Sequence, residues 1–176
     1  RRGSFGDLDR WPAVAQGLPR DPLRGAGPDL TLRMQAVARP GPEADRGVVE
    51  RIRSEAKRLA AVTRGGASGY SLAEMAALAY PDRIGLRRKG EAPRWVLSGG
   101  KGAAMASGLA LSGARLIVVT DLDGDAREAT VRQAVAISEA EVRGLYADRI
   151  GWVEVCEWSR REGRVVSRRQ ERLGAV

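Results

Sequence analysis

A change in hydrophobic period at Pro81 constrains the fold of this 176-residue chain more than any other feature. Before Pro81, apolar residues recur every three or four positions, which predicts helices. After it, they alternate within short segments separated by Gly, Pro or Asp clusters, which is typical of a small antiparallel barrel or sandwich. A proline also disfavours helical geometry in the residue before it, so the last helix must end near Tyr80. We therefore predict an α+β chain whose helical part comes first.

Three helices are predicted in that first part. Apolar spacing indicates a short helix over residues 29–38 and a longer one over 43–62. Ser71 and Glu74 have the spacing of a capping box, in which each residue's side chain bonds the other's backbone amide, and this predicts a third helix. We expect the three helices to form a partial helical bundle.

The β-prone part is followed by one more helix and a tail. The predicted strands cover residues 84–88, 94–98, 116–122 and 129–137. Ser138, with Glu141 three residues on, predicts the start of a helix that ends near Ile150. Beyond it, alternation from Trp152 to Trp158 predicts a strand that can pair back with residues 164–169 as a β-hairpin.

The residue types that are missing exclude several kinds of chemistry. The chain has no histidine and a single cysteine, Cys156. It therefore cannot build a Ser-His-Asp triad, a Cys/His zinc site, a CxxC redox pair or an internal disulfide. Cys156 lies in an alternating stretch, so we expect a reduced, half-buried core thiol and, with it, a cytoplasmic location. No apolar stretch is long enough to span a bilayer, so no membrane partner is expected.

Two motifs resemble ligand-binding loops but depart from the required pattern. The Ser98–Gly102 segment has the glycines and lysine of a phosphate loop, but Gly102 stands where the magnesium-binding Ser or Thr belongs. The Asp121–Asp125 segment starts like a calcium loop, but Ala126 and Arg132 replace the required Gly and Glu. We interpret both as turns and expect no metal site.

Basic residues are concentrated near the first two predicted strands. Between residues 83 and 102 the only acid, Glu91, stands against six cations: Arg83, Arg87, Arg88, Lys89, Arg94 and Lys101. Arginines supply paired donors to phosphate oxygens, so these six residues form a candidate nucleic-acid site. Trp95 lies inside the run and is either an exposed platform for a base or an ordinary core residue.

A second excess of arginine lies in the tail. Six arginines against two glutamates occupy residues 159–173. Nucleic-acid contact and a solvated strand face are equally good interpretations of this segment.

Three sequence blocks resemble one protein family. They are Ala76-Ala77-Leu78-Ala79-Tyr80-Pro81-Asp82-Arg83-Ile84, Trp95-Val96-Leu97-Ser98-Gly99-Gly100-Lys101-Gly102-Ala103 and Arg115-Leu116-Ile117-Val118-Val119-Thr120-Asp121-Leu122-Asp123. In order and spacing they resemble the C-terminal region of bacterial HrpB-type ATP-dependent RNA helicases of the DEAH class. The resemblance covers most of the chain from about residue 20.

This resemblance implies a domain organisation. Residues 1–28 would be a linker or truncated edge, and residues 29–80 the helical, ratchet-like helicase-associated region. Residues 81–150 would be an oligonucleotide-binding (OB)-like barrel with its closing helix, and residues 151–176 the start of a family-specific domain.

It also implies partners and leaves two functions open. In such helicases ATP and magnesium are bound by two RecA-like domains, and this sequence has neither a Walker A motif nor a DEAH tetrapeptide. We therefore expect no cofactor here, and as partners single-stranded RNA and the RecA-like domains of a parent chain. One hypothesis is a non-catalytic region that binds RNA or closes an RNA channel. The alternative is a protein-interaction module that packs on the motor domains or an activator.

Overall fold

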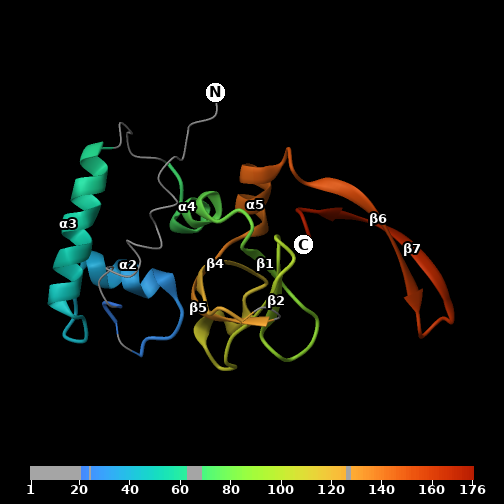
Figure 1. Cartoon of the computed structure of the whole chain (residues 1–176), viewed down its shortest axis with the longest axis horizontal. Coiled ribbons are helices and arrows are strands. Elements are labelled where there is room, and N and C mark those ends of the chain that lie inside the picture. Colours follow the sequence, from blue (N-terminus) through green and yellow to red (C-terminus); the bar gives the residue numbers. More distant parts are fainter. Residues whose placement is uncertain (1–20, 24, 63–68, 126–127) are drawn as a thin grey trace. The chain divides into compact units, whose positions relative to one another are not determined.

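The computed structural model describes residues 21–23, 25–62, 69–125 and 128–176 (Figure 1). They divide into two compact units. The first lies within residues 1–26 and 32–67, and the second comprises residues 27–31 and 68–176. The linker expected over residues 1–28 therefore falls mostly outside the described residues. Within the described ranges, no helix has the length and apolar character needed to cross a membrane.

The first unit is built on two helices. They are α2 (Leu30–Ala38), whose first two residues belong to the second unit, and α3 (Arg46–Val62). Both lie within the predicted segments. The Asp45 carboxylate accepts a bond from the Val48 amide at 3.0 Å and so caps the helix, which explains why α3 starts at Arg46 rather than at the predicted residue 43. A small core of Leu23, Ala36, Ala44 and Val49 holds the unit together.

The second unit contains a closed five-stranded barrel. Its strands are β1 (Ile84–Arg87), β2 (Arg94–Leu97), β3 (Gly102–Ala104), β4 (Leu116–Leu122) and β5 (Glu128–Ala136). Around the barrel they follow the order β1-β2-β3-β5-β4, and β4 pairs back with β1. The predicted α+β class and barrel are confirmed, with two differences. The short strand β3, which begins at the last residue of the predicted turn, is not among the predicted strands, and it pairs with β5 in parallel rather than antiparallel.

The barrel strands bury residues on two sides. Trp95, Leu97, Ile117 and Val119 belong to a cluster that fills the barrel. The Trp95 side chain is fully buried, and its Nε1 donates to the Ala114 carbonyl at 3.1 Å. This bond satisfies the indole N–H in the core, as a buried tryptophan requires.

Two helices cover the barrel and share a second core with it. They are α4 (Leu72–Ala79) and α5 (Glu139–Tyr146), and their cluster includes Ile84 and Val118. The Tyr146 hydroxyl donates to the Ala77 carbonyl at 2.7 Å, and burial raises the pKa of Tyr146. Helix α4 thus packs with the barrel, whereas the expected domain boundary at residue 80 groups it with the earlier helices.

Both predicted capping boxes are present. In each, the serine hydroxyl accepts the backbone N–H of the glutamate, and the glutamate carboxylate accepts the serine N–H. The Ser71 hydroxyl also donates to Glu141 at 2.6 Å, so one box is bonded to the other. These bonds, that of Ser71 first, lower the pKa of Glu141.

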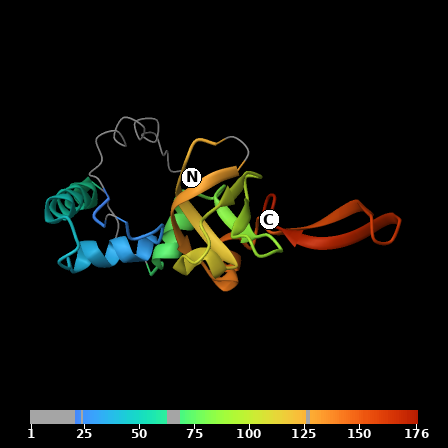
Figure 2. The same ribbon diagram turned by 90° about the horizontal axis from the view of Figure 1, so that it is seen from below.

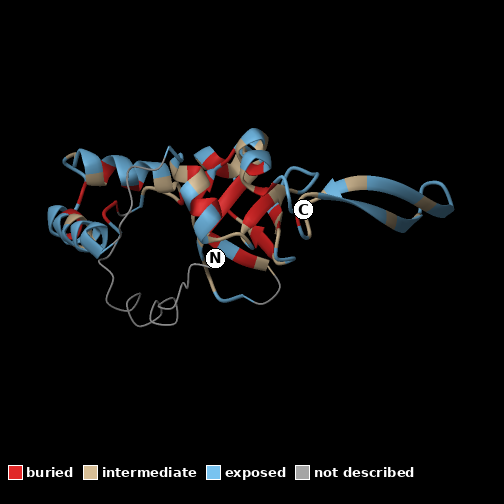
Figure 3. Ribbon diagram, turned by 90° about the horizontal axis from the view of Figure 1, so that it is seen from above, coloured by how far each residue is buried: buried red, intermediate tan, exposed pale blue. Residues whose placement is uncertain are grey.

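The tail forms the predicted hairpin, which projects from the barrel (Figure 2). Strand β6 (Gly151–Ser159) pairs antiparallel with β7 (Arg164–Arg172) over nine residues each. Neither face of the hairpin is covered by the described residues (Figure 3). Cys156 is consequently exposed, and the prediction of a half-buried core thiol is wrong. Alternation assigned Cys156 to a face of the strand but could not show that nothing packs on that face.

Candidate nucleic-acid interface

The barrel separates the predicted basic residues into two groups. Strand β1 runs antiparallel to β2, so residues at the start of β1 lie beside the end of β2. Arg83 and Lys101 therefore lie at one end of this strand pair. At the other end, around the loop that joins β1 to β2, lie Arg87, Arg88, Lys89 and Arg94.

Arg83 and Arg94 contact parts of the protein outside the β1–β2 loop. The Arg83 guanidinium donates to the Thr120 carbonyl at 3.2 Å and lies 4.9 Å from the centre of the Tyr80 ring. It connects the end of α4 to β4. Arg94 forms an ion pair with Glu128 at 3.2 Å. A phosphate would have to compete with these contacts, so neither residue is a strong candidate.

Arg87 occupies the last position of β1. Strand alternation places it on the same side as Gly85, which faces Leu97 and Ile117 inside the barrel. Its Nη2 donates to the Glu91 carbonyl at 3.2 Å, while its Nε is buried and has no hydrogen-bond partner among the described residues. No described carboxylate is within ion-pair distance, so the positive charge of Arg87 is not neutralised.

Arg88 and Lys89 begin the loop after β1, and both are exposed. The Arg88 amide donates to the Arg94 carbonyl at 2.8 Å, which closes the base of the loop. Gly90 follows with φ = 121°, a conformation that residues with a side chain rarely adopt. In the part of the chain that the structure describes, neither cation has an ion-pair partner. We call Arg87, Arg88 and Lys89 the β1–β2 loop cluster.

Trp95 is not part of this site. Its ring is fully enclosed, so the alternative of an exposed stacking platform is wrong and the core alternative is confirmed. The neighbouring outward positions on β2 and β3 are held by Arg94, Val96 and Ala104. The outward face of these two strands therefore offers no aromatic ring to a base.

Lys101 lies alone in the turn between β2 and β3. The Gly99 and Gly100 amides of this turn donate to the Asp82 and Leu97 carbonyls, at 2.8 and 2.7 Å. Amides that are bonded within the protein cannot also cradle a phosphate, which agrees with the interpretation of Ser98–Gly102 as a turn.

The calcium-like segment is also bonded internally. The Asp123 carboxylate accepts the Thr130 and Asp125 amides at 2.8 and 3.3 Å, and its bonds to Thr130 lower the pKa of Asp123. Among the described residues there is no group of three or more side chains able to hold a metal ion.

The structure adds cations that a linear run does not reveal. Arg115 precedes β4, and its carbonyl accepts the Arg87 amide at 2.8 Å, so it lies beside the loop cluster. An ion pair with Glu139 at 2.8 Å engages its side chain. Its place next to β1 follows from closure of the barrel, so it could have been found only by predicting that β4 pairs with β1.

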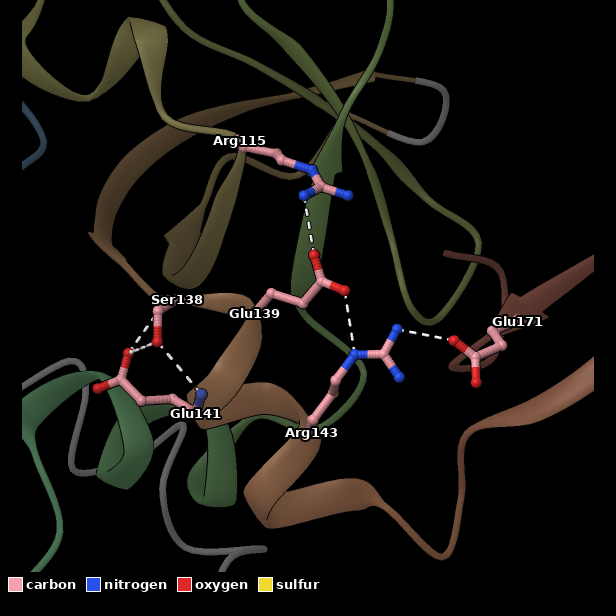
Figure 4. A network of polar contacts seen from close by, with 6 residues as sticks. All are labelled: Arg115, Ser138, Glu139, Glu141, Arg143 and Glu171. Atoms are coloured by element: carbon pink, nitrogen blue, oxygen red, sulfur yellow. Dashed lines mark hydrogen bonds and ion pairs between the residues drawn. The ribbon is translucent and has the colours of Figure 1, made fainter.

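Arg115 is the first member of a polar network that leads to the hairpin (Figure 4). Glu139 accepts from both Arg115 and Arg143, and Arg143 donates to Glu171 of β7 at 2.7 Å. Hydrogen bonding to Arg143, together with the charge of Arg115, lowers the pKa of Glu139. The network fixes the base of the hairpin to α5 and the barrel.

A closed barrel of five strands in this order is the architecture of OB-like domains, in which the loops β1–β2 and β4–β5 commonly contact oligonucleotides. The class of the second unit is thus an OB-like barrel with two covering helices and a projecting hairpin.

Solved structures identify the proteins in which this arrangement occurs. The chain is similar to the Escherichia coli DExH-box NTPase HrpB, with 27% identity over 88% of this chain and 18% of that one, and a TM-score of 0.62. A second structure, of the Escherichia coli DEAH/RHA helicase HrpB, matches 99% of this chain and 21% of that one, with 21% identity and a TM-score of 0.59. No protein-family model and no curated protein sequence matches the chain.

These similarities confirm the resemblance to a region of HrpB-type DEAH-box helicases that the sequence predicts. The chain spans about a fifth of the length of the HrpB chains it matches.

Proposed function

We propose that this chain is a non-catalytic region of an ATP-dependent RNA helicase that binds single-stranded RNA through the β1–β2 loop cluster. In this proposal the parent protein works in the cytoplasm, and its RecA-like domains, which bind ATP and magnesium, lie outside the sequence. Residues 29–80 are the helicase-associated helical region, residues 81–150 the barrel with its closing helix, and residues 151–176 the start of the family-specific domain.

The observation that carries the proposal is the cluster itself. Three consecutive cations, none paired with a described carboxylate, lie at the end of β1 and at the start of the loop that OB-like barrels commonly present to oligonucleotides. Arg83 and Arg94 are engaged within the protein, so they contribute less. Because the cluster reads phosphates and not base edges, the binding should have little sequence preference.

The test is a double charge reversal, Arg87→Glu with Arg88→Glu. Each phosphate contact of a single strand contributes about −0.7 to the slope of log K against log salt. The three residues of the loop cluster should together contribute about −2 to the slope. The double variant should make the slope shallower by about 1.4 and lower the affinity by about tenfold or more. Binding of a labelled oligouridine of about 12 nucleotides, followed by fluorescence anisotropy, measures both quantities.

A matched control changes the same charge elsewhere. Arg46 and Lys57 are exposed on α3 and form no ion pair with the described residues. Arg46→Glu with Lys57→Glu should leave the slope unchanged, if the loop cluster and not net charge binds the RNA. Equal losses in the two double variants would contradict the proposal.

The same experiment addresses the alternative of a protein-interaction module. If the basic loop serves to pack on motor domains or an activator, the Arg87/Arg88 variant should keep its RNA affinity. Stimulation of the parent ATPase, or binding of the partner, should then change instead.

A further inference from the structure

The hairpin exposes two tryptophans on one face. Trp152 and Trp158 alternate in phase along β6 and are 62% and 63% exposed, whereas Trp95 is fully buried. Directly opposite on β7 lie Glu171 and Val165. Residues directly opposite in an antiparallel pair share a face, so both indoles project to the same side of the hairpin. We call this side, defined by Trp152, Trp158, Val165 and Arg169, the tryptophan face.

This exposure is not required by the fold. A fully buried aromatic side chain contributes several times more to stability than one left in water, and these two indoles remain mostly in water. The hairpin is instead fixed at its base, where Leu173 is buried in the barrel core and the Ala175 amide donates to the Ser98 carbonyl at 3.0 Å. Neither ring is buried by the described residues.

The charges of the hairpin are unevenly distributed. On the opposite face Arg168 is paired with Glu157 at 3.0 Å. On the tryptophan face the Arg169 guanidinium forms no ion pair with the described residues and lies 5.5 Å from the centre of the Trp152 ring. Two carboxylates share that face, Glu154 opposite Arg169 and Glu171, which is bound to Arg143.

The turn at the tip of the hairpin adds further cations. Arg160 and Arg161 follow β6 directly, are exposed, and have no ion-pair partner among the described residues. Glu162 forms an ion pair with Arg164 at 2.7 Å. Trp152 thus has the cation Arg169 beside its ring, and two further cations, Arg160 and Arg161, lie in the turn that follows β6.

From this arrangement we infer that the tryptophan face is a stacking platform for unpaired bases of single-stranded RNA. An exposed ring next to an uncompensated cation is the combination by which proteins bind single strands without sequence preference: the ring takes a base and the cation its phosphate. Six residues of strand separate the two indoles by about 20 Å, so they receive bases from different positions of one strand. The inference rests on the proposed function, that the chain binds RNA, and adds the site that holds the bases.

The test replaces each indole with a side chain that is apolar but not aromatic. Trp158→Leu and Trp152→Leu should each weaken oligouridine binding by about 5- to 150-fold, the range measured for loss of one stacked base. Because no cation is removed, the salt slope should not change. Trp158→Phe and Trp152→Phe keep a ring, and their affinity for oligouridine should lie within about threefold of that of the unsubstituted 176-residue chain.

Val153→Ala is the matched control on the opposite face of the same strand, and it should leave RNA affinity unchanged. The rings are exposed, so all variants should have the thermal unfolding curve of the parent chain. Leucine variants that bind as tightly as the parent chain, or phenylalanine variants that bind as weakly as the leucine ones, overturn the inference.

These outcomes are separable from failure of the proposed function. If the Arg87/Arg88 reversal weakens binding and the leucine variants do not, the loop cluster binds RNA and the tryptophan face does not. If the unsubstituted 176-residue chain binds no oligouridine at about 50 mM salt, both the proposed function and the inference are wrong.

Discussion

The barrel and the hairpin use the same residue types in opposite ways. Both contain strands with alternating Trp and Val, yet Trp95 is fully buried and Trp158 is 63% exposed. The difference comes from closure: five strands curl around their own side chains and are covered by α4 and α5, whereas two strands leave both faces open. The large apolar residues of the barrel are thus buried, and those of the hairpin are left exposed by the described residues.

The largest predicted effect compares these two tryptophans directly. Trp95→Ala should lower the free energy of unfolding by about 3–5 kcal/mol, because it removes a fully buried ring and leaves a cavity. Trp158→Ala should change it by less than about 0.5 kcal/mol, as exposed positions do. Urea denaturation followed by circular dichroism measures both. Similar losses in the two variants would show that the hairpin is packed as tightly as the barrel.

The next effect tests how the hairpin is joined to the barrel, using two glycines with nearly the same backbone. Gly163, at the tip, has φ = 62° and open space around it, whereas Gly174 has φ = 61° and lies against the Ser98 carbonyl. Alanine at either position meets the left-handed penalty of about 1–2 kcal/mol. Gly174→Ala should cost more than Gly163→Ala, because its new Cβ also collides with backbone. Thermal unfolding compares the two variants. Equal shifts of their unfolding midpoints would contradict the close contact between Gly174 and the Ser98 carbonyl.

A smaller effect concerns the network that fixes the base of the hairpin. Arg143→Ala removes the bonds to Glu139 and Glu171, all of which are solvent-exposed, so global stability should hardly change. Hydrogen exchange of the β6 and β7 amides should nevertheless become faster, while exchange in β4 stays the same. Arg149→Ala is the control, because Arg149 stacks on Tyr146 and forms no ion pair with the described residues. Unchanged exchange in the hairpin would show that the network does not restrain it.

The smallest effect is a dependence on pH. Hydrogen bonds from Arg143 and Ser71 hold the pKa values of Glu139 and Glu141, respectively, below the ordinary value of a glutamate, so the folded state favours their charged forms. The stability that these two carboxylates contribute is complete above the ordinary pKa of a glutamate. It is lost as the pH falls through their lowered pKa values. The thermal stability of the unsubstituted chain should therefore fall below about pH 4.5, and that of Glu141→Gln should fall less. The same acid profile in both proteins would contradict the assignment to Glu141.

Local signals were sufficient to predict most of the helices and strands. The two capping boxes and the bounds of β4 follow from residue types and spacing alone. Strand β3 could not be predicted, because three residues after a glycine-rich turn show no period; its pairing with β2 and β5 is a consequence of barrel closure. Helix α5 also ends earlier than its apolar stripe, at Tyr146.

The candidate site was predicted less completely, for a related reason. A run of cations in sequence becomes two groups in space as soon as β1 and β2 form a hairpin, and Arg94 then meets Glu128 from β5. Alternation also could not decide between burial and exposure for Trp95 and Cys156, since it assigns a face but not what covers that face. Both questions depend on contacts between residues distant in the chain.

The most direct test of the account is an NMR titration of the 15N-labelled chain with oligouridine. The account predicts that the backbone amides of Arg88 and Lys89 and the indole N–H signals of Trp152 and Trp158 shift, while the indole signal of Trp95, bonded to Ala114, does not. A titration that leaves the loop amides and the two exposed indoles unmoved, or that moves only signals from α3, would contradict it.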